Sequence, residues 1–266
     1  MTVEEWLGKD NQLGIDIWSK KYRYKNETFD EWLNRVSGGN EDVRQLIEER
    51  KFLFGGRTLS NRGTDKNGSF SNCYSRGFVN DDLNDIMQAN TDIANTFKAQ
   101  GGQGISLSKL RPKGCGINHG QFKSDGIIPF MEIYNRTTES ISQGGSRKGA
   151  LIMSLDAWHK EAKDFITIKS QTGRIQKANL SLEIDDEFMK DVDTYYETGE
   201  EIKKTITRTY GSDNSITYEV CPIKLYKLMM QTAYDWAEPG CIFTNRFRNY
   251  NMMQYCDDYQ IETCNP

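Results

Sequence analysis

The segment from residue 125 to residue 155 constrains the fold most, because its physical character changes twice along its length. Its first part repeats apolar residues at helical spacing, which predicts a helix from about residue 125 to residue 142. Its last part, residues 150–155 (ALIMSL), is a short apolar run with the length of a strand. A helix followed by a buried strand favours the α/β class.

The loop between these two elements is polar and rich in glycine. Gly144, Gly145 and Gly149 relax the backbone, while Gln143 can both donate and accept hydrogen bonds and Arg147 adds a cation. Such a loop is either a surface turn or a segment that closes over a nucleotide, reading a base edge with Gln143 and charge with Arg147. One glycine-rich loop alone does not decide between them.

The same order of elements recurs earlier in the chain. Residues 80–85 (NDDLND) have the acids of a helix start, and that predicted helix ends at the glycine turn 101–104. An alternating strand, 105–108, and a loop with three cations, 109–114, come next. This loop suits a phosphate, although a solvated surface loop has the same composition.

Further helices and strands alternate beyond residue 155. The sequence predicts a helix over 159–168, a strand over 178–184, a hairpin over 202–220, a helix from Pro222 and a buried strand at 241–243. Alternation with crossovers of this size predicts an α/β fold with largely parallel pairing.

The first fifty or so residues are of a different kind. They have helical periodicity, and Thr28 with Glu31 forms a capping-box pattern, so residues 1–53 are predicted to be a small helical domain. From residue 54 the composition shifts to glycine, asparagine, serine and threonine, which predicts a long irregular loop that binds something.

Cys73 follows that polar loop. A thiol at the mouth of such a loop is a candidate for chemistry, and the alternative is a small residue of the core. The six cysteines contain no Cys-x-x-Cys pair and there are only two histidines, so the spacing of a zinc site is absent and no metal site is predicted.

The bulk properties exclude some classes of protein. The formal net charge is -4, with both signs spread along the chain, so no basic footprint for nucleic acid is present. No apolar run is long enough to span a membrane and the start lacks a signal-peptide pattern, so a cytoplasmic protein without membrane partners is expected. The chain stops on a strand-like segment, 261–266, which we interpret as an interruption.

Several segments together resemble the large, catalytic chain of ribonucleotide reductase, from about Phe54 to the last residue. Each is weak alone, but their order and spacing are jointly specific. They are RTLSNRGT (57–64), SNC (71–73), GGQGI (101–105), SKLRPKG (108–114), QGGSRKGA (143–150), AEPG (237–240) and ETCNP (262–266).

The resemblance implies a ten-stranded α/β barrel built from two five-stranded halves and preceded by helices. Residues 1–53 are then the helical N-terminal domain, and residues 54–266 are the first half of the barrel. It implies reduction of ribonucleotides to deoxyribonucleotides by thiyl-radical chemistry. The radical cysteine, the acid/base glutamate and the second reducing cysteine are not in this chain, so a complementary C-terminal half is expected to be needed for activity.

The resemblance also assigns residues to the active site. Cys73 matches one member of the cysteine pair that supplies electrons and is re-reduced by exchange with a thioredoxin-like reductant. Asn265 matches a residue that holds a substrate hydroxyl. Five positions match the lining of the substrate phosphate and ribose, the last two in a turn where backbone approaches the nucleotide: Thr58, Ser71, Asn72, Gly102 and Gly104.

Four residues match the site of an allosteric deoxynucleoside triphosphate or ATP. Asp81 matches an acid on the effector ribose and Arg111 a phosphate-binding arginine, whereas Gln143 and Arg147 fall on base-reading positions of the specificity loop. Because effector sites in this family lie between subunits, a homodimer through the helices near 82–99 and 125–142 is implied.

The subclass and two alternatives remain expectations. The Asn-Pro form and the lack of an obvious additional ATP-binding domain resemble the adenosylcobalamin-dependent type. The chain is then either one part of a split enzyme or a truncation. A different class of function is a non-catalytic deoxynucleotide-binding or regulatory remnant of the family, and a third is an unrelated α/β phosphate-binding enzyme. A half barrel exposes edges and apolar faces, so poor solubility alone is expected.

Overall fold

The computed structural model describes residues 1–66, 68–141, 149–171, 173–211, 214–253, 255–256, 261 and 263–264. The chain divides into two compact units, Met1–Asn72 and Cys73–Pro266. This division falls after Asn72, whereas the sequence predicts a domain boundary after residue 53. Residues 54–72 cluster with the first unit because their helix packs there through Leu59, which is buried in that core.

The first unit is helical, as the sequence predicts. Its elements are α1 (Val3–Leu7), α2 (Gln12–Ile17), the π-helix η1 (Trp18–Tyr22), α3 (Phe29–Ser37), α4 (Glu41–Glu48) and α5 (Gly56–Asn61). The predicted capping box is confirmed, since Thr28 accepts from the Glu31 amide and Glu31 accepts from the Thr28 amide. The expectation of an irregular loop after residue 54 is wrong where α5 forms.

The core of the second unit is a five-stranded sheet in which all pairs are parallel. Its order is β1-β2-β5-β6-β9, with β1 at Cys73–Phe78, β2 at Gly102–Ser106, β5 at Ala150–Asp156, β6 at Ala178–Ile184 and β9 at Gly240–Phe243. The predicted parallel α/β class is confirmed. The five strands correspond to the half barrel that the resemblance implied.

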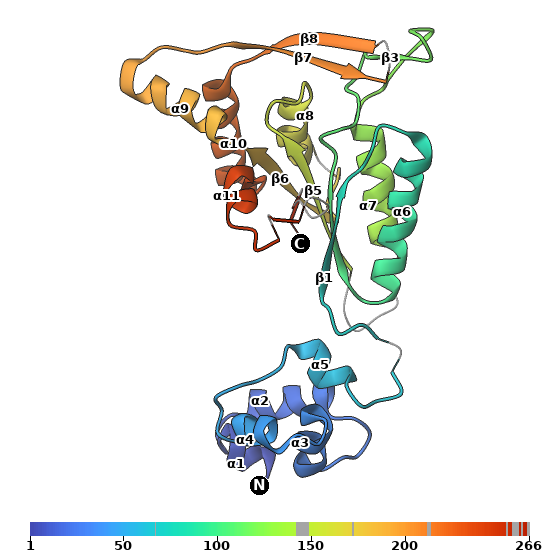
Figure 1. The fold of residues 1–266 in the computed structure, drawn as a ribbon, viewed down its shortest axis with the longest axis vertical. Coiled ribbons are helices and arrows are strands. Elements are labelled where there is room, and N and C mark those ends of the chain that lie inside the picture. The colour runs from blue at the N-terminus through green and yellow to red at the C-terminus, as the bar shows by residue number, and fades with distance from the viewer. Residues whose placement is uncertain are drawn as a thin grey trace. The chain divides into compact units, whose positions relative to one another are not determined.

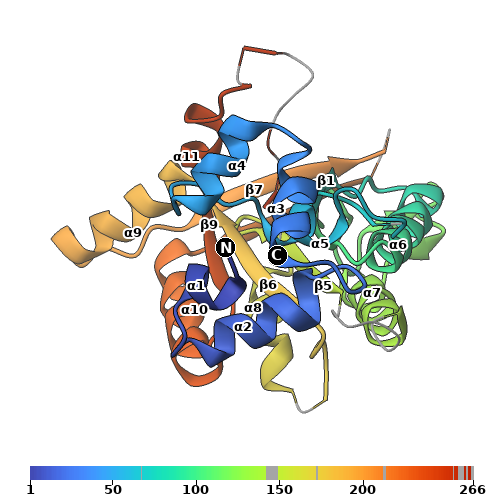
Figure 2. The same cartoon turned by 90° about the horizontal axis from the view of Figure 1, so that it is seen from below.

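Helices connect these strands (Figure 1). They are α6 (Leu83–Lys98), α7 (Ile128–Ile141), α8 (Ala162–Thr167) with the 3-10 turn η3 (Ile168–Ser170), α9 (Asp186–Thr198), α10 (Pro222–Trp236) and α11 (Thr244–Asn249). Helices α6 and α7 lie side by side in both views (Figures 1 and 2). Two antiparallel pairs complete the unit: β3 (Gly116–Ile117) with β4 (Phe122–Lys123), and β7 (Lys204–Tyr210) with β8 (Asn214–Val220).

The two faces of the sheet differ in chemistry, because side chains alternate along each strand. One face carries the large apolar side chains of the core, which α6, α7, α8 and α10 cover. Its central members are Ile105, Leu151, Met153, Leu155, Leu180 and Leu182. The other face carries mainly small and polar residues, namely Ser75, Gly104, Ser106, Ser154, Ser181 and Glu183, together with the apolar Ile152 and Ile242. The polar face can therefore form hydrogen bonds, whereas the apolar face packs against the helices.

One predicted turn is wrong. Gly102 and Gly104 were expected in a turn before a strand at 105–108, but both lie inside β2, and the strand ends at Ser106. Gly104 still permits a close backbone approach, because a Cβ there would overlap the carbonyl oxygen of Cys264. The glycine therefore accommodates another segment of this chain.

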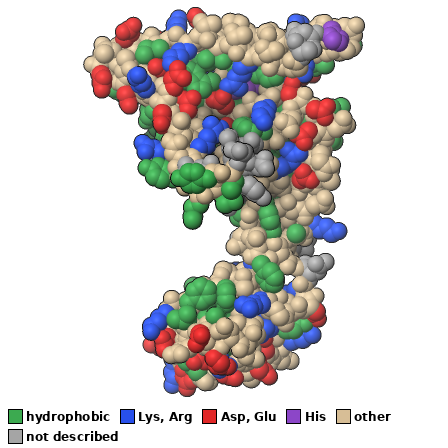
Figure 3. All heavy atoms as spheres, viewed as in Figure 1, with side chains coloured by type: hydrophobic (Ala, Val, Ile, Leu, Met, Phe, Trp, Pro, Cys, Tyr) green, Lys and Arg blue, Asp and Glu red, His purple; other side chains and the backbone are tan. Residues whose placement is uncertain are grey.

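Charges of both signs are mixed on the face that Figure 3 shows. Lys and Arg side chains are interspersed with Asp and Glu on the viewed face of each unit (Figure 3). Among the helices of the described residues, none combines the length and the apolar character that a membrane crossing requires.

Candidate functional site

Several predicted site residues meet at the amino-terminal edge of the sheet. Cys73 pairs in register with Gly102, and Gly102 pairs with Ala150. Ala150 is the first residue of β5, directly after the predicted specificity loop. Cys73 and its neighbour Gly102 therefore lie at the same edge from which that loop enters the sheet. Gln143 and Arg147 of the loop lie outside the described residues, as does Asn265.

The segment Thr263–Cys264 crosses the polar face of the sheet. The Thr263 carbonyl oxygen accepts a hydrogen bond from Ser75 Oγ of β1 (3.3 Å), and its Oγ1 lies 2.6 Å from Ser154 Oγ of β5. Between them, the Cys264 carbonyl lies against Gly104 of β2. Thr263 is only 2% exposed. The segment that precedes the predicted Asn265 is thus seated on three adjacent strands.

The buried carboxyl group of Glu183 is linked to this segment through Ser154. Glu183 of β6 is 6% exposed and accepts hydrogen bonds from Ser154 Oγ (2.6 Å) and from Ser108 Oγ (2.9 Å). Burial raises the pKa of Glu183, an effect that the serine hydroxyls partly oppose. Burial likewise raises the pKa of the Cys264 thiol. The polar face therefore disfavours charge and favours neutral donors and acceptors.

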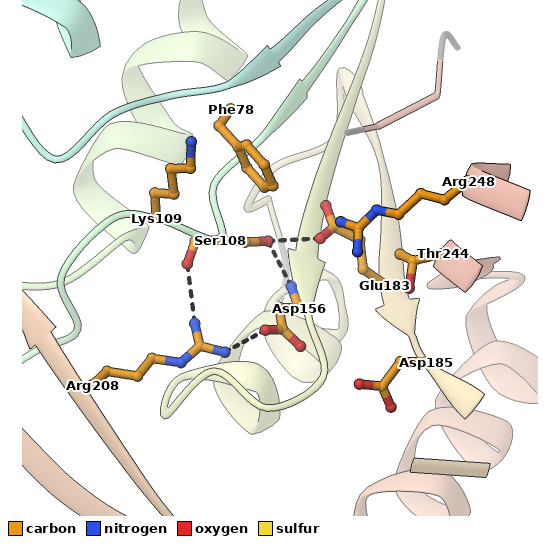
Figure 4. Close-up of a pocket in the computed structure, with 9 residues that line it drawn as sticks. All are labelled: Phe78, Ser108, Lys109, Asp156, Glu183, Asp185, Arg208, Thr244 and Arg248. Atoms are coloured by element: carbon orange, nitrogen blue, oxygen red, sulfur yellow. Dashed lines mark hydrogen bonds and ion pairs between the residues drawn. The ribbon is translucent and has the colours of Figure 1, made fainter. Parts of the chain in front are cut away.

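A cavity of about 340 Å³ opens at the carboxyl ends of the strands (Figure 4). Glu183 and Ser108 contribute to its wall, so the hydrogen-bonded chain described above reaches the cavity. On its other side the Arg208 side chain of β7 forms an ion pair with Asp156 and donates to the Ser108 carbonyl oxygen (3.1 Å). The β7–β8 hairpin is thereby fixed across the ends of β2 and β5.

Two predicted effector residues come together. Arg111 Nε donates to Asp81 Oδ2 (2.8 Å), the Arg111 amide donates to Asp81 Oδ1 (3.0 Å), and Arg111 Nη1 donates to the Gly116 carbonyl oxygen (2.6 Å). Both side chains are less than one-fifth exposed. Asp81 immediately precedes the N-cap of α6, so the pair lies at the start of the predicted dimer helix.

The remaining predicted substrate residues belong to the first unit. Thr58 is half-buried within α5, and Ser71 and Asn72 are exposed at the end of the unit, directly before Cys73. Sequence reasoning missed Glu183, Ser154 and Thr263. The signal for Ser154 and Glu183 was polar residues at alternate positions of otherwise apolar strands, which is typical of a strand with one polar buried face. Thr263 lies outside the strands and had no such signal.

Comparisons of the whole chain with known proteins point to one family. The model of the family described as ribonucleotide reductase, barrel domain, matches residues 71–266. A protein named vitamin B12-dependent ribonucleoside-diphosphate reductase, from Thermoplasma acidophilum, is 27% identical over 98% of this chain and 34% of its own length. The ribonucleoside-diphosphate reductase large chain of Cryptosporidium parvum is 34% identical over 50% of this chain and 17% of its own length.

A solved structure shares the fold. The alpha subunit of the class Id ribonucleotide reductase of Actinobacillus ureae matches 98% of this chain with a TM-score of 0.74 and 16% sequence identity. The match covers 45% of that subunit, so the chain spans less than half the length of each of these relatives. Because the family model matches well over half of the chain, the chain belongs to the ribonucleotide reductase large-chain barrel-domain family.

Proposed function

We propose that this chain is the N-terminal part of a ribonucleotide reductase catalytic subunit, which reduces ribonucleotides to deoxyribonucleotides. The observation that carries the proposal is the position of Cys73. It is half-buried at the edge of a half-barrel sheet and pairs with Gly102, and the strand of Gly102 pairs in turn with the strand that follows the specificity loop. A thiol there can reach a sugar bound over the polar face.

In the proposed reaction Cys73 supplies one of two thiols. The ribose loses its 2′-hydroxyl as water, and the two electrons come from oxidation of two thiols to one disulfide. A thioredoxin-like dithiol then restores both thiols by exchange. The hydrogen abstraction by a thiyl radical requires a cysteine that this chain does not supply. Cys73 therefore acts only in the completed barrel.

Substrate binding is proposed at the same edge. Ser71 and Asn72 precede Cys73 in the chain and offer a hydroxyl and an amide, and Thr58 offers a further hydroxyl. Gly102 and Gly104 carry no side chain on this face, so backbone can approach them closely, and at Gly104 that backbone is the Cys264 carbonyl. Asn265 follows the seated segment Thr263–Cys264 and would hold a ribose hydroxyl.

The effector is proposed to bind near the Asp81–Arg111 pair. Arg111 can bind phosphate while Asp81 accepts from ribose hydroxyls, and their mutual ion pair fixes both groups in advance. Gln143 and Arg147 would read the base of a deoxynucleoside triphosphate or ATP. Apolar side chains on α6 and α7 remain exposed, and they suit a homodimer contact: Leu83, Met87, Ile133 and Ile141.

The cobalamin-dependent type is proposed from sequence similarity alone, through the relative whose name states B12 dependence. A histidine side chain could ligate the cobalt ion of this cofactor. His159 is buried, with Nε2 2.9 Å from the Leu110 carbonyl oxygen and Nδ1 accepting from the Glu161 amide, so it is not free to ligate cobalt. Titration of the completed enzyme with adenosylcobalamin tests the subclass.

Activity is proposed to require the rest of the barrel. β1 and β9 are the outer strands of the sheet, and the end of β9 and the segment after it leave large apolar side chains exposed. They are Phe243, Phe247, Tyr250, Met252, Met253 and Tyr255. Such a surface favours association with a complementary half and poor solubility without it. The rival proposal, a non-catalytic deoxynucleotide-binding protein of the family, retains only the effector site.

Turnover of the completed enzyme tests the proposal. The chain is expressed with the polypeptide that supplies the second half of the barrel, and deoxyribonucleotide formation is followed with a dithiol reductant. Cys73→Ser should abolish steady turnover while nucleotide binding persists. Cys241→Ser, at an exposed cysteine of β9, is the matched control and should keep turnover. Deoxynucleotide binding without any turnover favours the rival proposal, and unchanged turnover in Cys73→Ser refutes the role of Cys73.

A further inference from the structure

The polar face of the sheet holds a continuous chain of buried hydrogen bonds that the proposed chemistry does not use. It links Thr263 to Ser154 (2.6 Å), Ser154 to Glu183 (2.6 Å) and Glu183 to Ser108 (2.9 Å). Ser154 is 0% exposed, and none of the four side chains exceeds 8% exposure. Groups buried this deeply are costly unless each hydrogen bond is made.

The direction of these hydrogen bonds follows from the donors present. Ser154 Oγ donates to Glu183 Oε1 and Ser108 Oγ donates to Glu183 Oε2. The Ser154 hydroxyl hydrogen is then used, and the Thr263 hydroxyl must donate to Ser154. Ser154 thus links the Thr263 side chain to the buried carboxyl group of Glu183. Glu183 lies on β6, which is separated from β2 by β5.

A second contact, between Gly104 and Cys264, fixes the segment Thr263–Cys264. A Cβ at position 104 would overlap the carbonyl oxygen of Cys264, which is a backbone atom and cannot rotate away. Gly240, in the edge strand β9, provides a comparison, because a Cβ there would come no closer than 3.0 Å to any neighbour, the nearest being the Ser181 hydroxyl. Gly104 is therefore required for the seat of Cys264 in a way that Gly240 is not.

We infer that Glu183, Ser154 and Gly104 are positioning residues, which seat Thr263–Cys264 so that the following Asn265 reaches the substrate. This inference rests on the proposed function. Glu183 and Ser154 touch neither the sugar nor the reacting thiols, and Gly104 contributes the space that the Cys264 carbonyl occupies. The inference makes β6 part of the apparatus that orients the ribose. Ser108 also lines the cavity at the carboxyl ends of the strands, so solvent in that cavity contacts the far end of the hydrogen-bonded chain.

Variants that keep or remove single hydrogen bonds separate this role from general packing. Glu183→Gln keeps an acceptor for Ser154, and its amide can donate to Ser108 if the hydroxyl of Ser108 turns toward Ser106, 2.9 Å away. Glu183→Leu removes both interactions. Thr263→Ser keeps the donor, whereas Thr263→Val removes it with little change of shape. Thr232→Val, at another buried threonine, on α10, is the control for loss of a hydroxyl.

The first measurement uses this chain itself. The rate of Cys264 alkylation is followed by mass spectrometry, with the buried Cys115 as an internal reference in the same digest. Glu183→Leu, Thr263→Val and Gly104→Ala should raise the rate by about tenfold or more, because the interactions that close the segment are lost. Glu183→Gln, Thr263→Ser, Gly240→Ala and Thr232→Val should stay near wild type. Equal rates in all variants overturn the inference.

The second measurement uses the completed enzyme. Glu183→Leu and Thr263→Val should raise KM for the ribonucleotide or lower kcat by about tenfold, and Glu183→Gln and Thr263→Ser should restore the wild-type values. Wild-type kinetics in Glu183→Leu overturn the positioning role even if the enzyme is a ribonucleotide reductase. If instead the wild-type enzyme forms no deoxyribonucleotide, the proposed function fails, and the alkylation rates alone decide whether these residues seat the segment.

Discussion

His159 gives the clearest prediction of pH-dependent stability. It is 1% exposed, its Nε2 donates to the Leu110 carbonyl oxygen (2.9 Å), and its Nδ1 accepts from the Glu161 amide (3.2 Å). The bond at Nδ1 requires the neutral ring, because a proton on Nδ1 would oppose the Glu161 N–H, whereas Nε2 can donate in either protonation state. Burial lowers the pKa of His159 from 6.5 to about 4.

The sign follows from proton linkage. Between about pH 4 and 6.5 the unfolded chain binds a proton at His159 that the folded chain does not, so the free energy of unfolding rises with pH in this window. The contribution is fully present above pH 6.5 and is lost as the pH falls toward 4. At about 1.4 kcal/mol per pKa unit, it amounts to roughly 3 kcal/mol.

Urea unfolding of the wild type and His159→Gln, followed by circular dichroism from pH 4 to 7.5, measures this contribution. The raised pKa values of the buried Glu161 and Glu183 give the opposite slope, but both proteins contain these groups. The free energy of unfolding of the wild type, relative to that of the variant, should therefore fall by roughly 3 kcal/mol in total as the pH falls. A difference that does not change with pH would refute the neutral, doubly bonded histidine.

Three further predictions concern other parts of the chain. Thr28→Ala should lower the free energy of unfolding of the first unit by about 1 kcal/mol, since the capping box of α3 is lost, and urea unfolding of residues 1–72 within the full chain checks it. Gly149→Ala should lower the free energy of unfolding by about 1–3 kcal/mol, because the new Cβ would overlap the buried Phe97 ring. An unchanged midpoint of thermal unfolding would argue against that contact. Arg111→Lys should weaken deoxynucleoside triphosphate binding by about tenfold, because lysine cannot form the two-pronged contact, and calorimetry with the chain measures it; equal affinity would exclude Arg111 from the effector site.

The regular elements of the second unit were predictable because their periods are clear. β5 and β6 appear within a residue or so of their predicted bounds, and the helix expected near 125–142 appears as α7 (Ile128–Ile141). α5 was missed because glycine and hydroxyl residues disfavour helices locally, while the burial of Leu59 stabilises this one. Tertiary contacts overrode the local preference.

The candidate site was predictable only in part. The resemblance assigned Cys73, Gly102 and Gly104 to the active site and Asp81 and Arg111 separately to the effector site, and these roles stay predictions. The ion pair between Asp81 and Arg111 was not predicted. The link from Thr263 to Ser154 joins residues 109 positions apart, and no local pattern encodes it. Gly104 was singled out for an approach of backbone to nucleotide, whereas the structure places the Cys264 carbonyl there.

The most direct test of the central claim is a single turnover without external reductant. The completed enzyme is mixed with ribonucleotide and effector, the product is quantified, and the cysteines are mapped by mass spectrometry under non-reducing conditions. The proposal predicts at most one deoxyribonucleotide per barrel, with Cys73 in a disulfide in the same proportion. Deoxyribonucleotide formed while Cys73 remains a free thiol would contradict it.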